Sequence, residues 1–380
     1  MGQGLNIDSA VSDVAKAVAM GIDAFALNVG QPDPDWSVDC VKRFFNAAQG
    51  TKLKIFFSLD LYATNDPERF RKMINDYLGH PNYYTVGPNN LPMLSHFSNG
   101  NGWTATSWNN FRESLKERTY FVPMFDQFPN YYTKPDAFWS SWSVPSAASS
   151  HLDASLMRRA YREGKAYMTG LSTFQYKHYK NDHWYRVGDT VMPEKMTQLL
   201  ALSNTAGNRP DFIQIQSWND AGEGHYIGHL RHESLLKEQL AYANQDEHPH
   251  DGWQPLFTSF INAWKSNAKD ASQMQTPAGS RTFVVGAMWH REFLASSSCS
   301  GTDGKPLGGR AAWWQPHLQG EAAAGSQLPL CPVVKTGEQH VQVVDAAGVP
   351  IIESGKKTKG IAANPKGDLC TYNYRVAWLV

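Results

Sequence analysis

Helix-like and strand-like patterns alternate from the N-terminus to about residue 218. Residues 8–20 place Val11, Val14 and Val18 on one face of a helix, and Gly21 can end that helix. The apolar run 22–28 follows at once and ends in a polar residue, which is typical of a buried parallel strand. The same pair then repeats, with helices expected at 36–48, 66–79, 106–118, 153–164 and 193–203 and strands at 54–60, 91–97, 120–126, 166–171 and 211–218.

Strands that alternate with helices of ten or more residues predict parallel βαβ units, and hence an α/β fold. Their number fits a (β/α)₈ barrel, a TIM-like barrel, better than a short open sheet. In such a barrel the active site lies on loops at the carboxyl ends of the strands. We therefore expect the polar residues at or just beyond the strand ends to converge on one mouth, namely Asn28, Asp60, His96, Asp126 and Asp220.

The pattern changes from about residue 277. Residues 281–289 form one more strand-like run, and short alternating segments such as 340–344 follow between Gly-rich and Pro-rich turns. Short strands of this kind predict a small C-terminal β-sandwich. We divide the chain into a catalytic barrel at 1–295 and a β-sandwich accessory region at 296–380, which is expected to be truncated because the chain stops within a strand-like pattern.

Charge and cysteine content exclude several classes of function. The 35 Lys and Arg residues balance the 35 Asp and Glu residues, so no basic field is present to bind nucleic acid or an anionic membrane surface. No apolar run is long enough to span a membrane, and no signal peptide is visible. The four cysteines are too far apart in sequence for a metal site: Cys40, Cys299, Cys331 and Cys370. One disulfide is expected among the last three if the protein meets an oxidising compartment, but the sequence does not determine which two pair. We expect no cofactor and no metal.

Two carboxylates close in sequence point to hydrolytic chemistry. Cleavage of a glycosidic bond usually takes one carboxyl group that gives a proton and a second that activates water or attacks directly. Asp220 and Glu223 form such a pair beyond the strand at 211–218, and Asp60 ends another strand. The alternatives are acidic residues in the first turn of a helix for the pair, and an Asp bonded to loop amides for Asp60.

Aromatic side chains are abundant, with 13 Trp and 16 Tyr. They can stack on sugar rings, or they can fill the core. As sugar contacts we nominate polar and aromatic residues near the strand ends, some of which are expected to be packing residues: Asn28, Tyr62, His96, Asp126, Trp218, Asn219, His225 and Tyr226. Trp139, Trp142 and Trp184 are further stacking candidates on expected loops.

Four motifs together resemble one family. They are GIDAFALN at 21–28, FSLD at 57–60, SWNDAGE at 217–223 and HDGW at 250–253. In this order they resemble the fungal α-1,3-glucanases, or mutanases, of glycoside hydrolase family 71, over roughly residues 8–295. The resemblance implies a secreted or cell-wall enzyme, an endo-acting, inverting hydrolase of α-1,3-glucan with a (β/α)₈ barrel beside a β-sandwich. We also expect a monomer.

The resemblance also maps the family's essential acids onto Asp60, Asp220 and Glu223. Inversion needs an acid and a base about 6.5–9.5 Å apart, so that a water fits behind the sugar. We assign Glu223 as acid and Asp220 as base, although Asp60 could hold the water instead. One departure is that the apolar first strand of the family is absent here, so the barrel is expected to lack its first strand. The alternatives are a glucan-binding protein that has lost catalysis, and a glycosidase of another linkage.

Overall fold

The computed structural model describes residues 7–98, 102–124, 137–140, 149–173, 175–179, 182–186, 191–202, 208–243, 245–280, 285–291, 312–314, 342–344, 347–354 and 374–378. The chain forms two compact units. Unit 1 comprises Met1–Ser143, Ala148–Gly170 and Asn204–Gln214, and unit 2 comprises Val144–Ala147, Leu171–Ser203 and Ile215–Val380. The predicted division at residue 295 stays a prediction.

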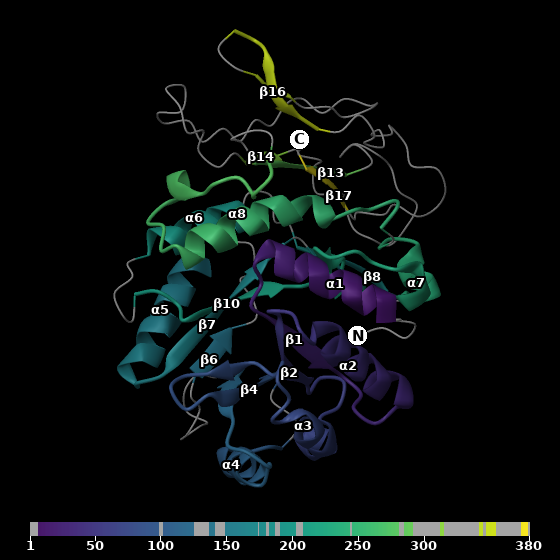
Figure 1. Cartoon of the computed structure of the whole chain (residues 1–380), viewed down its shortest axis with the longest axis vertical. Helices are drawn as coiled ribbons and strands as arrows, with labels where there is room; N and C mark the ends of the chain where they lie inside the picture. The colour runs from purple at the N-terminus through teal and green to yellow at the C-terminus, as the bar shows by residue number, and fades with distance from the viewer. Residues whose placement is uncertain are drawn as a thin grey trace. The chain divides into compact units, whose positions relative to one another are not determined.

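Unit 1 follows the predicted alternation of helices and strands (Figure 1). Its elements are α1 (Ile7–Met20), β1 (Ala24–Val29), α2 (Asp35–Ala48), β2 (Lys54–Asp60), α3 (Arg71–Tyr77), β3 (Thr85–Val86), β4 (Leu91–Phe97), α4 (Ala105–Glu113), β5 (Tyr120–Pro123), β6 (Ala137–Ser140) and α5 (Ser149–Arg162). Two further strands begin in unit 1 and continue into unit 2, namely β7 (Ala166–Ser172) and β10 (Phe212–Gln216).

The strands of unit 1 confirm an α/β chain with parallel strands. β1 pairs with β2, β2 with β4, and β4 with β5, all in parallel, and β6 pairs in parallel with β7. The short β3 adds an antiparallel edge to β4. Strand β6 was not predicted from the sequence. Closure of these strands into a barrel stays a prediction.

An aromatic cluster joins the helices of unit 1 to its sheet. Phe45 of α2 stacks on Tyr77 of α3 at 4.2 Å between ring centroids, and both rings contact Phe57 of β2. Phe45 and Phe57 are fully buried, as expected for a helix stripe that covers a parallel strand. Below this cluster, the buried Asn82 amide donates to Ala48 O at 2.8 Å and Leu53 O at 2.9 Å, which satisfies backbone carbonyls of the α2–β2 connection.

Two of the predicted helices have bounds that local contacts explain. The helix expected at 66–79 begins as a 3₁₀ turn, Pro67–Phe70, because Asp66 accepts the amide of Glu68 and Pro67 is suited to a first turn. The helix expected at 106–118 ends at Glu113, where the Ser114 hydroxyl donates to Phe111 O.

Unit 2 contains short helices and antiparallel strand pairs. Its elements are β8 (Gln175–Tyr179), β9 (Asp182–Arg186), α6 (Val191–Ala201), β11 (Asn219–Asp220), β12 (His225–Tyr226), α7 (Lys237–Leu240), α8 (Gln254–Lys265), β13 (Ala287–Arg291), β14 (Ala312–Trp314), β15 (Gln342–Val344), β16 (Pro350–Glu353) and β17 (Tyr374–Trp378). The β8–β9 hairpin and α8 were not predicted.

The C-terminal strands pair with a strand from the region expected to be barrel. β13 lies between β14 and β17 in an antiparallel sheet, and β15 pairs with β16. Gly252, in the motif at 250–253, lies against β17, since a Cβ at that position would be 2.6 Å from Val376 O. Trp253 is fully buried against Trp289 of β13. This motif therefore packs α8 onto the antiparallel sheet, and the complete sandwich stays a prediction.

Among the described residues, Cys40 is a free, buried thiol, and burial raises its pKa. Cys299, Cys331 and Cys370 lie outside the described residues. In the same part of the chain, no helix combines the length and the apolar character needed to cross a membrane.

Candidate active site

Asp60 lies at the end of β2 in unit 1. Its Oδ1 accepts the backbone amides of Tyr62 at 3.1 Å and Ala63 at 3.2 Å, which folds the loop after β2 around the carboxyl group. Burial raises the pKa of Asp60, although these two amide donors act in the opposite direction. Bonding to loop amides was the structural alternative, and it is present, but no hydrogen bond joins Oδ2 to the part of the chain that the structure describes.

Two nominated sugar contacts lie near Asp60. Asn28 is exposed on β1, where it pairs in register with Ser58 of β2. Tyr62 is 84% exposed, so its ring is accessible to a ligand. Gly30 lies beside the acid, and a Cβ there would be 3.0 Å from Ala63 Cβ and 3.5 Å from Asp60 Oδ2. The loop therefore leaves little room for a larger residue next to this carboxyl group.

His96 does not fit its nomination as a sugar contact. Its register partner on β2 is Leu59, whereas Asp60 pairs with Phe97. Because successive side chains of a strand point to opposite faces, His96 and Asp60 are on opposite sides of the sheet. The His96 ring is fully buried and stacks on Trp108 of α4 at 4.6 Å, and burial lowers its pKa to about 3. His96 is therefore a neutral packing residue.

The structure does not describe the side chains of several nominated residues. Asp126 and Trp142 lie outside the described residues. Trp139 and Trp184 were expected on loops, but their backbones belong to β6 and β9.

In unit 2, one hairpin carries both predicted catalytic carboxylates. β11 pairs with β12 so that Asp220 faces His225 and Asn219 faces Tyr226, and residues 221–224 form the turn. The amide of Glu223 donates to Asp220 Oδ1 at 3.1 Å. Asp220 and Glu223 therefore lie at the two ends of a tight turn, rather than in the first turn of a helix.

Ser217 fixes the base of this hairpin. Its hydroxyl donates to His225 O and accepts the amide of Asp220 at 3.0 Å. Trp218 is half-buried and packs on Gly228, where a Cβ would be 2.5 Å from the indole Nε1. Asn219 is exposed. Of the aromatic and amide residues nominated here, Trp218 and Asn219 remain accessible.

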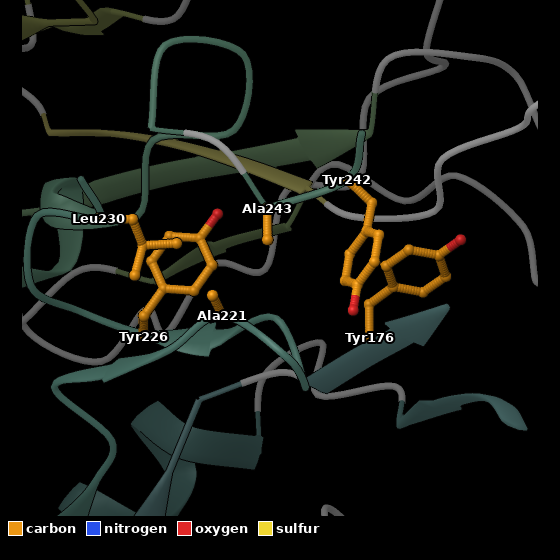
Figure 2. Packing of buried hydrophobic residues seen from close by; sticks show 6 residues of the cluster. All are labelled: Tyr176, Ala221, Tyr226, Leu230, Tyr242 and Ala243. Atoms are coloured by element: carbon orange, nitrogen blue, oxygen red, sulfur yellow. The ribbon is translucent and has the colours of Figure 1, made fainter. Parts of the chain in front are cut away.

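A buried cluster packs against the turn (Figure 2). Tyr176 and Tyr242 form an edge-to-face pair at 5.7 Å, Leu230 lies over Tyr226, and Ala221 lies between the two groups. The Tyr242 hydroxyl also donates to Gly222 O at 2.9 Å. The turn that carries Glu223 is thus attached to the core.

Tyr226 and His225 are packing residues in this arrangement. Tyr226 is fully buried, its hydroxyl donates to His248 O at 2.6 Å, and its ring stacks on His250 at 3.9 Å. His225 is 3% exposed. Neither side chain is accessible as a direct sugar contact, which corrects both nominations.

Gln175, which the sequence did not single out, contacts the predicted acid. It is the first residue of β8, and its Nε2 donates to Glu223 Oε2 at 3.2 Å and lies 2.9 Å from His225 Nδ1. The amide of the next residue, Tyr176, donates to Glu223 O at 2.8 Å. The only sequence signal was the position of Gln175 just beyond the strand that became β7.

Asp60 belongs to unit 1, whereas Asp220 and Glu223 belong to unit 2. Their convergence on one mouth therefore stays a prediction. Among the described residues, no group of three or more His, Cys, Asp or Glu side chains is arranged to hold a metal ion. What unit 2 places together is an accessible pair of carboxylates, each with its own hydrogen-bond donor, which is an arrangement suited to acid–base chemistry.

A family model described as "Glycosyl hydrolase family 71" matches residues 3–324. The chain belongs to glycosyl hydrolase family 71. The motif resemblance is thereby confirmed, and the matched range includes every residue nominated above.

Two curated relatives of the chain come from fungi. A mutanase of Penicillium rubens is 29% identical over 313 residues, which are 78% of this chain and 64% of that protein. A glucan endo-1,3-alpha-glucosidase of Schizosaccharomyces pombe is 26% identical over 67% of this chain and 61% of its own length. The chain thus spans less than two thirds of the length of either relative.

Solved structures of a GH99 endo-alpha-mannosidase from Bacteroides thetaiotaomicron resemble the fold of this family 71 chain. One has a TM-score of 0.52 at 11% identity, covering 69% of this chain and 80% of that one. A second, in complex with BIS-TRIS-propane, has a TM-score of 0.53 at 12% identity, covering 69% and 84%. The likeness concerns the fold alone.

Proposed function

We propose that this chain hydrolyses α-1,3-glucan at internal bonds, with inversion at the anomeric carbon. The proposal is supported by membership of family 71 and by the names of the fungal relatives. The observation that carries it is the β11–β12 hairpin, which holds Asp220 and Glu223 at the two ends of one turn. Glycosidic hydrolysis usually takes two carboxyl groups with different tasks, and this hairpin offers them.

Glu223 is the proposed general acid and Asp220 the proposed general base. Glu223 gives its proton to the glycosidic oxygen as the bond from that oxygen to the anomeric carbon breaks. Asp220 takes a proton from a water molecule, whose oxygen attacks the anomeric carbon from the opposite face. The amide of Glu223 donates to Asp220 Oδ1, which favours the ionised form that a base requires.

Asp60 is the third proposed acid. In the alternative assignment it holds the attacking water in place of Asp220, which then orients the sugar or sets the pKa of Glu223. Burial raises the pKa of Asp60, which makes its carboxylate a better proton acceptor than that of an exposed Asp. Either assignment of Asp60 requires a (β/α)₈ barrel that brings the ends of its strands together. A β-sandwich accessory region beside this barrel is also part of the proposal.

The accessible nominated residues are proposed to line the sugar subsites. Tyr62 and Trp218 offer aromatic surface, and Asn28 and Asn219 offer amides. The enzyme is further proposed to act as a monomer that is secreted or located in the cell wall. The name of one relative, an ascus wall endo-1,3-alpha-glucanase of Schizosaccharomyces pombe, supports the wall location.

Hydrolysis of insoluble α-1,3-glucan, followed by release of reducing ends, tests the proposal. Glu223→Gln and Asp220→Asn should each lower kcat by roughly 10²- to 10⁴-fold, the usual contribution of a general acid or base, while sedimentation with the polymer stays unchanged. Glu238→Gln, which changes an exposed glutamate on α7, is the matched control and should keep full activity.

The product and the substrate range separate the alternatives. Proton NMR during the reaction should show β-anomeric ends first if configuration is inverted. A chain that sediments with the polymer but releases nothing would be a glucan-binding protein. Equal release from an α-1,4-glucan would reassign the linkage, and full activity of both acid variants would refute the site.

A further inference from the structure

The Gln175 side chain connects two groups of the candidate site. Gln175 is 3% exposed and His225 is 3% exposed, so neither exchanges its partner for bulk water. Gln175 Nε2 lies 3.2 Å from Glu223 Oε2 and 2.9 Å from His225 Nδ1. One buried amide nitrogen therefore serves both a carboxyl group and an imidazole.

The chemistry of an amide nitrogen fixes the direction of both hydrogen bonds. It carries two hydrogens and accepts none, so Nε2 donates one to Glu223 Oε2 and the other to His225 Nδ1. His225 must then be the neutral tautomer with its proton on Nε2. A flipped Gln175 amide would bring its oxygen to both partners, and would then need a proton on Glu223 Oε2 and another on His225 Nδ1. With Nε2 as the donor, both Glu223 Oε2 and His225 Nδ1 act as acceptors.

Backbone contacts hold the turn independently of this side chain. The Tyr176 amide donates to Glu223 O at 2.8 Å, and Gly224 has φ +57 and passes so close to Tyr176 that a Cβ would be 2.7 Å from Tyr176 O. The β8 backbone thus contributes to the position of the turn, whereas the Gln175 side chain contacts the Glu223 carboxyl group itself. The two contributions can be separated by mutation.

We propose that Gln175 is a positioning residue, which holds Glu223 Oε2 so that the acidic proton is carried by Oε1 and directed at the leaving oxygen. This inference rests on the proposed function, in which Glu223 is the general acid. Gln175 itself transfers no proton. It acts through Glu223, and its removal should impair the step that protonates the leaving group more than it impairs binding.

The test compares two substrates with the same glycan and different leaving groups. One is an α-1,3-linked gluco-oligosaccharide, and the other carries 2,4-dinitrophenolate, which departs without a proton. Gln175→Met keeps the volume and removes both donors. On the plain oligosaccharide its kcat should fall about 10-fold, the upper range for the loss of one hydrogen bond between neutral groups, with KM nearly unchanged. On the activated substrate its kcat should stay within about threefold of wild type.

Two further variants complete the comparison. Gln254→Met is the matched control, because Gln254 Nε2 donates at 2.8 Å to a backbone carbonyl, that of Ile227, and to no carboxylate. Its kcat should be close to wild type on both substrates. Gln175→Asn shortens the side chain by one methylene and keeps the site polar. It should give the same leaving-group dependence, and it keeps the inference testable if Gln175→Met does not fold.

The outcomes separate this inference from the proposed function. If the wild type releases no sugar from either substrate, the proposed function fails and the inference fails with it. The inference alone is overturned if Glu223→Gln shows the leaving-group dependence but the two Gln175 variants do not. They would then either keep the wild-type kcat on both substrates or show the same fall in kcat on both. A fall in kcat on the plain substrate but not on the activated one, in Glu223→Gln and in the Gln175 variants, supports the inference.

Discussion

Asp60 experiences two opposing influences on its carboxyl group. The amides of Tyr62 and Ala63 donate to Oδ1 and favour the charge, whereas burial disfavours it, and burial prevails because the pKa is raised. Folding therefore takes up protons at Asp60 between the ordinary pKa of an Asp and the raised one. Stability falls as pH rises through this window, so at neutral pH the ionised carboxylate costs stability.

Asp60→Asn should remove this cost while it removes activity. The amide oxygen can still accept both backbone donors, and no buried charge remains. We expect a thermal midpoint at pH 7 equal to or above that of the wild type, an advantage that shrinks as the pH is lowered toward about 4, and loss of glucan hydrolysis. Asp66→Asn is the control, because Asp66 is half-buried, also accepts a backbone amide, that of Glu68, and should give no such gain in thermal midpoint. A midpoint clearly below wild type at pH 7 would contradict the argument.

At the scale of elements, strand positions were predictable and side-chain direction was not. β2 and β4 have the bounds that were predicted, because buried apolar runs with a polar end are a local signal. His96 was nominated for its place at a strand end, but the parallel register sets it opposite Leu59 and toward α4. A shift of one residue exchanges the two faces of a strand, and register is a tertiary property.

The β8–β9 hairpin shows a second limit of the sequence. Its alternation of aromatic and polar residues, QYKHY, has no clear apolar face, so no strand was predicted there. Gln175 meets Glu223 across 48 positions of the chain. Motifs around 217–223 could indicate the acids from local sequence, whereas the donor that faces one of them comes from another element and has no local signal.

Gly224 should tolerate no side chain, because two requirements coincide there. Its φ of +57 is strained for other residues, and an added Cβ would lie 2.7 Å from Tyr176 O, which is backbone and cannot rotate away. Gly224→Ala should therefore separate the turn from β8, lower stability by more than the roughly 1–2 kcal/mol of the φ strain alone, and lower glucan hydrolysis at least tenfold. Chemical unfolding and reducing-end release measure the two effects.

Gly164→Ala is the matched control for this prediction. Gly164 follows α5 with a φ of +68, and nothing lies within 4 Å of an added Cβ. It should lose only the stability expected from its φ and keep full hydrolysis. If both variants lose stability and activity to the same extent, contact between Gly224 and Tyr176 has no separate role in shaping the site.

At the scale of the whole molecule, the alternation of helices and strands in unit 1 was predictable from local patterns, apart from β3 and β6. The partners of the C-terminal strands were not. β13 has the same apolar character as a barrel strand, yet it pairs antiparallel with β14 and β17, and β17 lies more than eighty positions away in the chain. An apolar run indicates that a strand is buried, but the topology of the fold determines which strands pair with it.

Charge is the property of the whole chain that bears most directly on the proposed substrate. With 35 basic and 35 acidic residues the net charge is zero, and the proposed glucan substrate is uncharged, so neither would attract the other over distance. Binding must then come from stacking and hydrogen bonds at the accessible residues, such as Tyr62 and Trp218.

We expect the rate of α-1,3-glucan hydrolysis to change less than about twofold between 50 and 500 mM NaCl. By contrast, the affinity of a protein that binds through phosphate contacts falls about 10³- to 10⁵-fold over a smaller range of salt. Initial rates across a salt series measure this, and Asn219→Lys, which adds a charge beside the acids, is the comparison variant. A steep fall of the wild-type rate with salt would mean that charged groups of the substrate or of the enzyme contribute to binding, and the neutral glucan would no longer be the fitting ligand.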